Sequence, residues 1–371
     1  GGDDRAFVDK GGARERIDGS GATVIRADYA VPAVTHAPME TLTATARFRD
    51  DRLELWVPSQ SISFARAAVA RALGLKDSHV VVYQTLIGGG FGRKIEVDAA
   101  IQAATIARRV GRPVQLIWSR LQDSIAGYPR PPARARLAAV LDGDKMIAAW
   151  DATIAAPSTS AEMMARLTGR GGGGAEAAAV EGALPPYAIP AVRIAHAPAA
   201  TGVPTGIWRS VANSYTAFFT ECFIDELATA AALDPLNFRL RLLANHPRHA
   251  ETLKTAASLG GYAPGSSEAA QGLALHGCFG SIVAVMAEVD PDLSGSARVR
   301  RLVCAADCGR VINPDIVRQQ LEGGMIWGLA AAMTGKLSYQ GGLPQERNFD
   351  GFALPILADM PEIEVHLIDS A

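Results

Sequence analysis

The sequence predicts an α+β fold in which mixed sheets pack against helices. Segments rich in β-branched residues occur in pairs separated by short polar turns, and 43–48 with 53–57 around the turn 49–52 form a hairpin pattern. Other segments, such as 95–110 and 314–333, carry apolar residues at helical spacing. The 371 residues are 49% hydrophobic and 20% charged, which is enough apolar material for two domains of ordinary size.

The remaining elements follow from the same two patterns in chain order. Strands are expected at 23–34, 43–48, 53–57, 79–83, 114–118, 134–141, 145–155, 299–306 and 361–369, and helices at 62–73, 95–110, 215–232 and 314–333. Asn313 is placed to be the N-cap of the last helix, with Pro314 at its first position. Residues 161–178 are rich in glycine and alanine and are expected to form a mobile loop.

Composition divides the chain into four parts. Residues 1–22 are polar and glycine-rich, as in a linker or a frayed lead-in. Residues 23–245 form the expected first domain and residues 273–371 the expected second domain. Residues 246–272 are expected to link them, because a loop with a proline is followed there by a passage rich in glycine and serine.

Charge and cysteine content exclude several classes of protein. Lys and Arg number 36 against 38 Asp and Glu, so no basic face for nucleic acid is expected. No apolar run is long enough to cross a bilayer, and no charged-then-apolar leader opens the chain. Cys222, Cys278, Cys304 and Cys308 include no Cys-x-x-Cys pair. We therefore expect buried thiols rather than an iron–sulfur ligand set or disulfides.

The segment 84–94, QTLIGGGFGRK, lies between the expected strand 79–83 and the helix that follows it. Glycines at 88–90 allow positive φ and bring backbone N–H groups close to a ligand's oxygens, although a turn that binds nothing would use the same glycines. The segment lacks the Gly-Lys-Ser/Thr ending of a P-loop and the dinucleotide fingerprint. Phe91, flanked by glycines, is placed to form the wall of a site.

Other polar residues lie at junctions between elements and allow two interpretations each. Gln60 follows a strand and precedes a helix, where an amide commonly caps the helix or stabilises the turn. Arg209 follows a tryptophan, as a surface cation stacked on an aromatic ring would. His36 and Glu40 are four residues apart and could bind a metal from one helix face. A proline between them argues against a helix, so a structural role is expected.

Several motifs together resemble the molybdenum hydroxylase large subunits, the xanthine dehydrogenase and aldehyde oxidase family. The motifs are GGGFGRK at 88–94, HAPME at 36–40, GIWRSV at 206–211 followed by ECFIDELA and DPLNFRLRLL, and DCGRVINPDIVRQQLEGGMIWGL at 307–329. The Arg-Lys ending of the first motif is most similar to the isoquinoline 1-oxidoreductase-like branch. That branch usually has proline after HAPME, where this chain has Thr41. The resemblance covers essentially all of this chain, which would correspond to the middle of a family subunit.

The resemblance implies a molybdopterin-type molybdenum cofactor in its cytosine dinucleotide form, held by the two expected domains. The implied cofactor-binding residues are Gln60, Gly89, Gly90, Phe91, Gly92, Arg209, Gly280 and Ser281. In this interpretation Gln60 hydrogen-bonds an oxygen ligand of the metal, and Arg209 donates beside it from its fixed fork of N–H groups. Gly280 and Ser281 would touch the pterin, and a plain strand bulge is the local alternative. No protein side chain is expected to bind the metal.

The family reaction hydroxylates a carbon beside nitrogen in an aromatic heterocycle, or oxidises an aldehyde, with oxygen from water. Its general-base glutamate belongs to a GVGE motif that is expected beyond Ala371, so no catalytic residue is assigned. Glu40, Glu96 and Glu221 lie outside such a motif. The isolated chain is therefore expected to be inactive. The resemblance further implies a small iron–sulfur partner subunit, a cytochrome as one electron acceptor, and the bacterial periplasm, with the cytoplasm as the alternative compartment.

Two functions from other classes remain open at this stage. A nucleotide- or phosphate-binding enzyme would use the glycines at 88–90 and bind a mononucleotide without molybdenum or pterin. A cofactor-free structural or interaction module descended from the oxidoreductase would keep the fold with an empty loop. The segments around Gln60, Arg209 and Asp307 favour the oxidoreductase, because a generic phosphate loop does not require all three.

Overall fold

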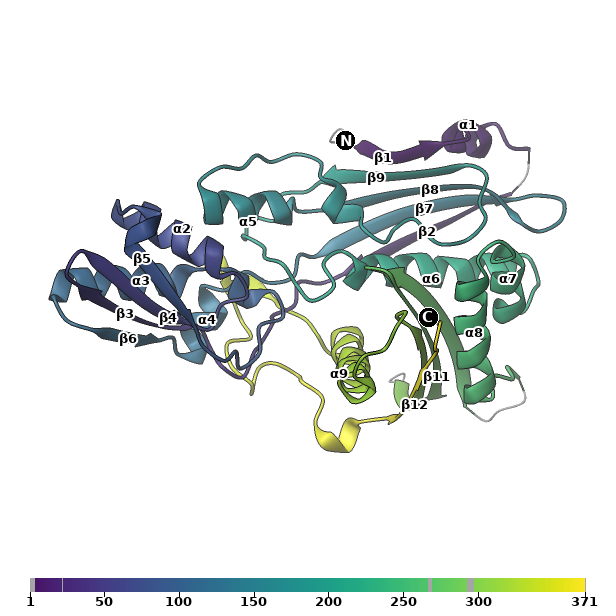
Figure 1. Ribbon diagram of the computed structural model, residues 1–371. Helices are drawn as coiled ribbons and strands as arrows, with labels where there is room; N and C mark the ends of the chain where they lie inside the picture. Colours follow the sequence, from purple (N-terminus) through teal and green to yellow (C-terminus); the bar gives the residue numbers. More distant parts are fainter. Residues whose placement is uncertain (1–3, 22, 266–268, 292–296, 371) are drawn as a thin grey trace.

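The computed structural model describes residues 4–21, 23–265, 269–291 and 297–370. Its largest sheet has five strands in the order β1-β9-β8-β7-β2 (Figure 1). These strands are β1 (Arg5–Lys10), β2 (Val24–Val31), β7 (Ala133–Leu141), β8 (Ile147–Ala156) and β9 (Val192–Pro198). All neighbours are antiparallel except β8 and β9, which are parallel. The sheet is therefore mixed, as expected.

A second sheet, with the order β5-β4-β3-β6, carries the first part of the candidate site. Its strands are β3 (Thr43–Arg49), β4 (Arg52–Val57), β5 (Val80–Gln84) and β6 (Val114–Ile117). The helices α2 (Ile62–Leu73) and α3 (Asp98–Val110) pack against it, and α3 buries five alanines along one face. Because alanine is small, α3 can lie close to β3.

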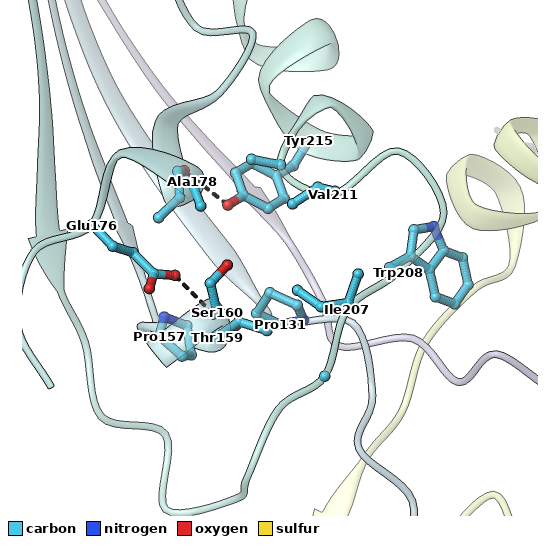
Figure 2. A pocket seen from close by; sticks show the side chains of 13 residues that line it. Pro131, Pro157, Thr159, Ser160, Glu176, Ala178, Ile207, Trp208, Val211 and Tyr215 are labelled. Atoms are coloured by element: carbon cyan, nitrogen blue, oxygen red, sulfur yellow. Dashed lines mark hydrogen bonds between the residues drawn. The ribbon is translucent and has the colours of Figure 1, made fainter. Parts of the chain in front are cut away.

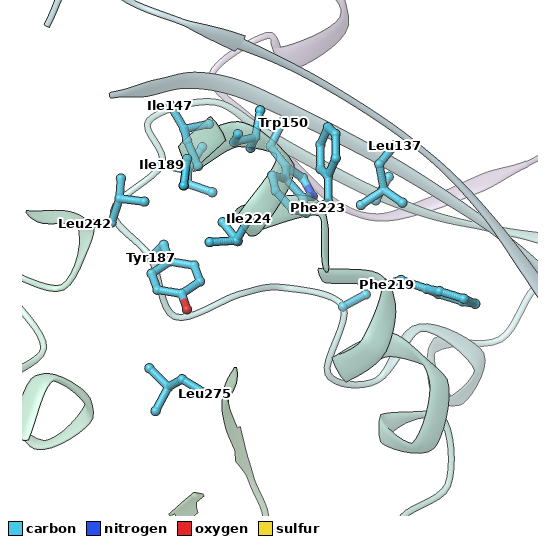
Figure 3. Packing of buried hydrophobic residues seen from close by; sticks show 14 of the residues in the cluster. Leu137, Ile147, Trp150, Tyr187, Ile189, Phe219, Phe223, Ile224, Leu242 and Leu275 are labelled. Carbon is cyan, nitrogen blue, oxygen red and sulfur yellow. The ribbon is translucent and has the colours of Figure 1, made fainter. Parts of the chain in front are cut away.

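The third sheet has the order β10-β11-β12-β15. Its strands are β10 (Ala270–Cys278), β11 (Ser281–Pro291), β12 (Ala297–Asp307) and β15 (Glu362–Leu367), which runs parallel to β12. Helix α6 (Asn213–Ala230) lies between this sheet and the five-stranded sheet (Figure 1). One apolar cluster joins the two sheets through α6, with Trp150, Phe223 and Leu275 among its buried members (Figure 3). The principal core therefore spans both expected domains.

The other elements connect or cover these sheets. They are α1 (Ala13–Asp18), η1 (Asp77–His79), η2 (Arg93–Ile95), α4 (Arg120–Ile125), α5 (Thr159–Thr168), η3 (Ala177–Val180), α7 (Pro235–Leu242), α8 (Pro247–Gly260), α9 (Pro314–Met333), β13 (Tyr339–Gln340), β14 (Leu343–Pro344) and η4 (Leu357–Asp359). In the described part of the chain, no helix is long and apolar enough to span a bilayer. Within the same residues, no group of three His, Cys, Asp or Glu side chains is arranged to hold a metal.

Most expected elements are present, and the bounds of α2 and α9 match the prediction. The mixed α+β fold class is confirmed. The expectation of buried thiols holds for Cys304, whereas Cys222, Cys278 and Cys308 are half-buried. The strand expected at 79–83 is β5, an edge strand that leaves Tyr83 exposed.

Three segments expected to be irregular are ordered elements instead. The lead-in 1–22 contains β1 and α1, because β1 pairs with β9 and Asp4 forms ion pairs with Arg14 and Arg193. The linker 246–272 contains α8, which packs on the third sheet through buried Leu253 and Ala256. In the expected loop 161–178, residues 161–168 belong to α5, whereas 169–176 form no helix or strand. Tertiary contacts override the local composition in each case. Residues 1–3, 22 and 266–268 of these segments lie outside the described part.

Candidate functional site

The glycine loop, residues 88–94, connects β5 to the turn before α3 and has an unusual backbone. Gly89, Phe91 and Gly92 have φ of 90°, 55° and 100°. Glycine adopts such values without a steric penalty, whereas Phe91 in this left-handed region costs about 1 kcal/mol. A strained residue of this kind persists only where surrounding contacts hold it, and such residues are concentrated at functional sites.

Gln60 closes the glycine loop from the neighbouring strand end. Its Oε1 accepts hydrogen bonds from the backbone N–H of Gly92 at 3.0 Å and of Lys94 at 3.3 Å. A Cβ at position 90 would lie 2.5 Å from the same oxygen, so the approach requires Gly90. Among the described residues, Nε2 of Gln60 has no protein partner. The exposed amide is therefore oriented by the loop and keeps its donor group for a ligand.

The second candidate segment, 206–211, lies directly against the glycine loop. A Cβ at position 92 would lie 1.9 Å from the carbonyl oxygen of Ile207, so only Gly92 fits there. The same carbonyl accepts a 2.6 Å hydrogen bond from Nε2 of His36, which is 3% exposed. Burial lowers the pKa of His36 to about 3, with the charge of Arg93 acting in the same direction. A neutral His36 thus has the structural role expected for it.

Arg209 is a candidate for binding an anion. Its guanidinium is half-buried and donates to the backbone oxygen of Gln320 at 2.9 Å, on α9. In the described part of the chain it forms no ion pair with a carboxylate. Burial lowers the pKa of Arg209, but a guanidinium remains charged at neutral pH. A half-buried cation without a counterion favours an anionic or oxygen-rich ligand beside it.

An aromatic cluster joins the glycine loop to α9. The ring centroid of Trp327 lies 4.2 Å from that of Phe91 and 4.8 Å from that of Trp208. Nε1 of Trp327 is buried without a hydrogen-bond partner in the described structure. Gln320, Gly324 and Trp327 have helical spacing i, i+4, i+7 and share one face of α9. Sequence analysis missed Gln320 and Trp327, although this spacing was the available signal.

Gly280 and Ser281 occupy a different position from the other candidates. Phe279 and Gly280 have φ of 51° and 84° and form the two-residue turn between β10 and β11, while Ser281 pairs with Cys278 at its base. The local alternative of a strand bulge is therefore wrong, since two positive φ values are typical of a type I′ hairpin. No described hydrogen bond joins Gly280 or Ser281 to Gln60 or Arg209. The hairpin reaches the start of α6 through His276, which lies 2.7 Å from Oδ1 of Asn213.

The three carboxylates that were left unassigned all have structural partners. Glu40 forms an ion pair with Lys94, and Glu96 with Arg166. Glu221 is 5% exposed and accepts from the Arg239 guanidinium, from the hydroxyl of Tyr187 and from the N–H of Leu275. Each carboxylate is therefore occupied, and none is arranged as a free general base.

A small pocket lies behind the 206–211 segment (Figure 2). Ile207, Trp208 and Tyr215 line it on one side. Glu176 on the other side accepts hydrogen bonds from the backbone N–H groups of Ser160 and Ala161 at the start of α5. Because its carboxylate caps this helix, the pocket offers no free acid to a ligand.

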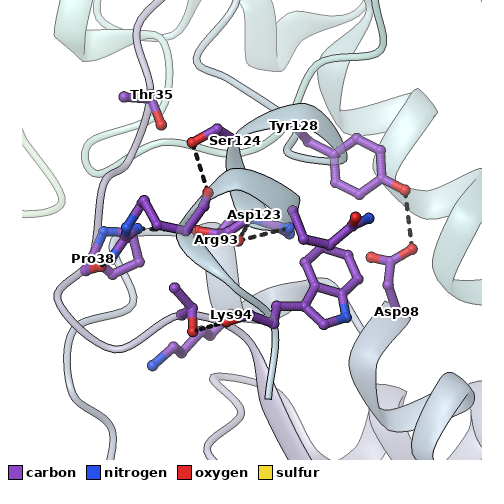
Figure 4. A network of polar contacts seen from close by, with 12 residues as sticks. Thr35, Pro38, Arg93, Lys94, Asp98, Asp123, Ser124 and Tyr128 are labelled. Atoms are coloured by element: carbon purple, nitrogen blue, oxygen red, sulfur yellow. Dashed lines mark hydrogen bonds and ion pairs between the residues drawn. The ribbon is translucent and has the colours of Figure 1, made fainter. Parts of the chain in front are cut away.

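The basic pair that ends the glycine loop is buried beneath it (Figure 4). Arg93 is 3% exposed, lies 3.2 Å from Oδ1 of Asp123, and stacks over the rings of Trp118 and Tyr128. Lys94 is 1% exposed and pairs with Glu40. Neither cation is available to a phosphate group, which removes the basis for a nucleotide-binding loop.

Comparisons with known proteins show the family of the chain. Two family models, each described as a molybdopterin cofactor-binding domain, match residues 3–243 and 227–361. The chain is 32% identical to isoquinoline 1-oxidoreductase subunit beta of Brevundimonas diminuta over 91% of this chain and 44% of that protein. It is 28% identical to a membrane-bound aldehyde dehydrogenase [pyrroloquinoline-quinone] of Gluconacetobacter polyoxogenes, over 95% of this chain and 49% of the relative.

Solved structures show the same fold. Quinoline 2-oxidoreductase from Pseudomonas putida 86 aligns with a TM-score of 0.85 at 15% identity, covering 99% of this chain and 72% of that one. The chain spans less than half the length of the two curated relatives. Their whole-protein properties therefore reach beyond the residues present here.

Proposed function

This chain belongs to the molybdopterin cofactor-binding domain family, and from that premise we propose that it is the central part of a molybdenum-dependent oxidoreductase. The reaction proposed is hydroxylation of N-heterocycles, or oxidation of aldehydes, with oxygen from water. The relative named isoquinoline 1-oxidoreductase supports the first substrate class, and the relative named aldehyde dehydrogenase supports the second. The family models and the curated relatives give no support to a nucleotide- or phosphate-binding enzyme or to a cofactor-free structural module.

The observation that carries the proposal is the half-buried Arg209, which has no carboxylate partner in the described structure. Gln60 adds an amide donor that has no partner among the described residues, and within the same residues the buried Nε1 of Trp327 is also unpaired. Gly90 and Gly92 let the glycine loop pack directly against the Gln60 side chain and the backbone of Ile207. This set offers donors and positive charge without free carboxylates, which fits an oxygen-rich anionic cofactor.

Within this proposal the chain's own residues bind, orient and exclude water. The bound molybdenum cofactor would supply the metal's redox and oxygen-transfer chemistry. Gln60 would donate to an oxygen of the group, and Arg209 would stabilise negative charge beside it from a fixed position. Phe91, with Trp327 against it, would keep water from one side of the site. We propose that the general base is supplied by residues outside this chain, and that the isolated chain is inactive.

We further propose a cytosine dinucleotide form of the cofactor, with Gly280 and Ser281 contacting the pterin. Iron–sulfur clusters are proposed on a small partner subunit, since the four free cysteines in the described residues form no ligand set. A cytochrome as electron acceptor and the bacterial periplasm as compartment, with the cytoplasm as alternative, rest on the family resemblance alone.

Molybdenum and pterin content tests the proposal. Elemental analysis and fluorescence of the oxidised pterin would be measured on this chain and on a version extended at both ends. We expect both components in the extended form, and their absence from both forms would overturn the proposal. Pyrroloquinoline quinone in place of molybdenum would also overturn it and would match the second relative's name instead.

A pair of variants links that occupancy to the site. Arg209→Met should lower the molybdenum content of the extended protein about tenfold, because the substitution removes a charge-assisted donor. Arg241→Met, at an exposed arginine on α7, is the matched control and should leave the content unchanged. Equal molybdenum content in both variants would argue against a role for Arg209.

A further inference from the structure

Glu40 is joined to the first residue of the glycine loop by reciprocal hydrogen bonds. Its Oε2 accepts from the N–H of Gly88 at 2.9 Å, and its own N–H donates to the carbonyl oxygen of Gly88 at 3.1 Å. A Cβ at position 88 would lie 2.6 Å from the Cβ of Glu40. The HAPME segment and the glycine loop are therefore in close contact at this point, and Gly88 permits the contact.

The same carboxylate oxygen also pairs with the last residue of the loop. Nζ of Lys94 forms an ion pair with Oε2 of Glu40, and Lys94 is 1% exposed. Burial alone would raise the pKa of Glu40, but Lys94 and the N–H of Gly88 hold that pKa below its ordinary value. Lysine is almost never buried to this extent without a partner. One carboxylate thus connects both ends of the glycine loop.

The backbone of Lys94 extends this connection to Gln60. Its carbonyl oxygen accepts from the N–H of Gln60 at 2.9 Å, and its N–H donates to Oε1 of Gln60 at 3.3 Å. The three residues with positive φ, Gly89, Phe91 and Gly92, lie between the two ends that Glu40 connects. A strained segment of this kind needs such contacts at both ends to stay in one conformation.

We propose that Glu40 and Lys94 are positioning residues that hold the glycine loop and the Gln60 amide in the conformation required for the cofactor. The inference rests on the proposed function, because it concerns how the same site is organised. The ion pair acts through the loop backbone and through Gln60. Lys94, the last residue of GGGFGRK, therefore has a structural role within the chain and does not bind phosphate.

Amide hydrogen exchange of the cofactor-free chain tests the positioning role directly. In Lys94→Met, exchange at the N–H groups of Gly88 and Gly92 should increase at least about tenfold, because the loop loses its buried tie. Lys76→Met, at an exposed lysine, is the matched control and should leave both rates unchanged. Unchanged exchange at both amides in Lys94→Met would overturn the inference.

A double variant separates positioning from general loss of stability. Lys94→Met leaves Glu40 without its cation, whereas Lys94→Met with Glu40→Gln removes both charges and should recover much of the lost thermal stability. We expect the double variant to keep the fast exchange at Gly92 and a molybdenum and pterin content about tenfold below that of the unaltered extended protein. Recovery of slow exchange and full occupancy in the double variant would overturn the inference.

The failure of this inference is distinguishable from failure of the proposed function. If the unaltered extended protein holds molybdenum and pterin, and the Lys94 variants hold as much, the positioning role is wrong and the function stands. If the unaltered extended protein holds neither, the function is wrong and the cofactor-related part of the inference is overturned with it.

Discussion

The two longest helices, α6 and α9, have similar apolar content and opposite surroundings. Helix α6 has 18 residues and buries ten of them, because it lies between the five-stranded sheet and the third sheet. Helix α9 has 20 residues, and none of them is buried in the described structure. Ile224 on α6 is 0% exposed, whereas Ile316 on α9 is 56% exposed. Helical spacing of apolar residues therefore predicts a helix, and the sheets around the helix decide whether it belongs to the core.

The Arg209 part of the candidate site lies at the junction of these two helices. Arg209 is four residues before Asn213, the first residue of α6, and it donates to Gln320 on α9. The ring of Trp208, in the segment that precedes α6, also contacts the ring of Trp327 on α9. Arg209 is thus held on one side by α6, which lies in the main core. On the other side it contacts α9, whose residues stay partly exposed in the described structure.

The largest expected effect is on the α6 side, at the buried ion-pair network of Arg239. Arg239 is 0% exposed and bonds to Glu221 and Asp225 on α6, which raise its pKa despite its burial. In Arg239→Met the carboxylate of Glu221 would remain buried without its cation, which costs about 3–5 kcal/mol of unfolding free energy. Chemical denaturation measures this change.

Arg241→Met is the matched control, because Arg241 lies on α7 together with Arg239. Arg241 is exposed, and among the described residues it bonds only to a backbone carbonyl. We expect its unfolding free energy to stay within about 0.5 kcal/mol of the unaltered chain. Equal, small changes in the two variants would mean that the α6 side tolerates an unpaired carboxylate and is loosely packed.

A pH-dependent effect on the free energy of unfolding is expected from His36, which lies at the junction. The pKa of His36 falls to about 3 in the folded chain through burial, while an unfolded histidine titrates near 6.5. The unfolded state therefore binds more protons than the folded state between these two values. The stability contribution of neutral His36 is complete above pH 6.5 and is lost as pH falls toward 3, by up to about 1.4 kcal/mol per pH unit.

His36→Gln isolates this contribution from that of the carboxylates, which also titrate in acid. Glutamine keeps an N–H donor for the carbonyl of Ile207 but cannot be protonated. The slope of unfolding free energy against pH should become shallower between pH 6.5 and 3. Identical slopes in the two proteins would show that His36 is accessible to protons in the folded chain, and that the junction is looser than the core.

Much of the fold could be predicted because local signals marked it. Helix α9 has Asn313 as a side-chain N-cap and proline at its first turn, and α2 ends at Gly74 with φ of 64°, so both helices could be bounded from sequence. Strand β1 and α8 could not be found in this way. Their polar and glycine-rich surroundings favour loops, and pairing with β9 or packing on the third sheet outweighs that preference.

The candidate site likewise has parts that could be predicted from sequence and parts that could not. The glycine loop, Gln60 and Arg209 were identified from short motifs, because each lies at a junction between elements that is visible in sequence. The contacts between these residues could not be predicted from sequence. Gly92, for example, packs against Ile207, which lies more than a hundred residues later in the chain. Long-range contacts of this kind also explain why Trp327 was missed.

The smallest expected effect is on the α9 side and tests the comparison directly. Ile316→Ala removes side-chain surface that is already 56% exposed, so the unfolding free energy should change by less than about 0.5 kcal/mol. The same substitution at the buried Ile224 of α6 should cost about 2–5 kcal/mol, because it opens a cavity in the core. A cost of 2 kcal/mol or more at Ile316, growing with protein concentration, would mean that a second copy of the chain covers α9 in solution. The difference in burial between α6 and α9 would then hold for the single chain but not for the dimer in solution.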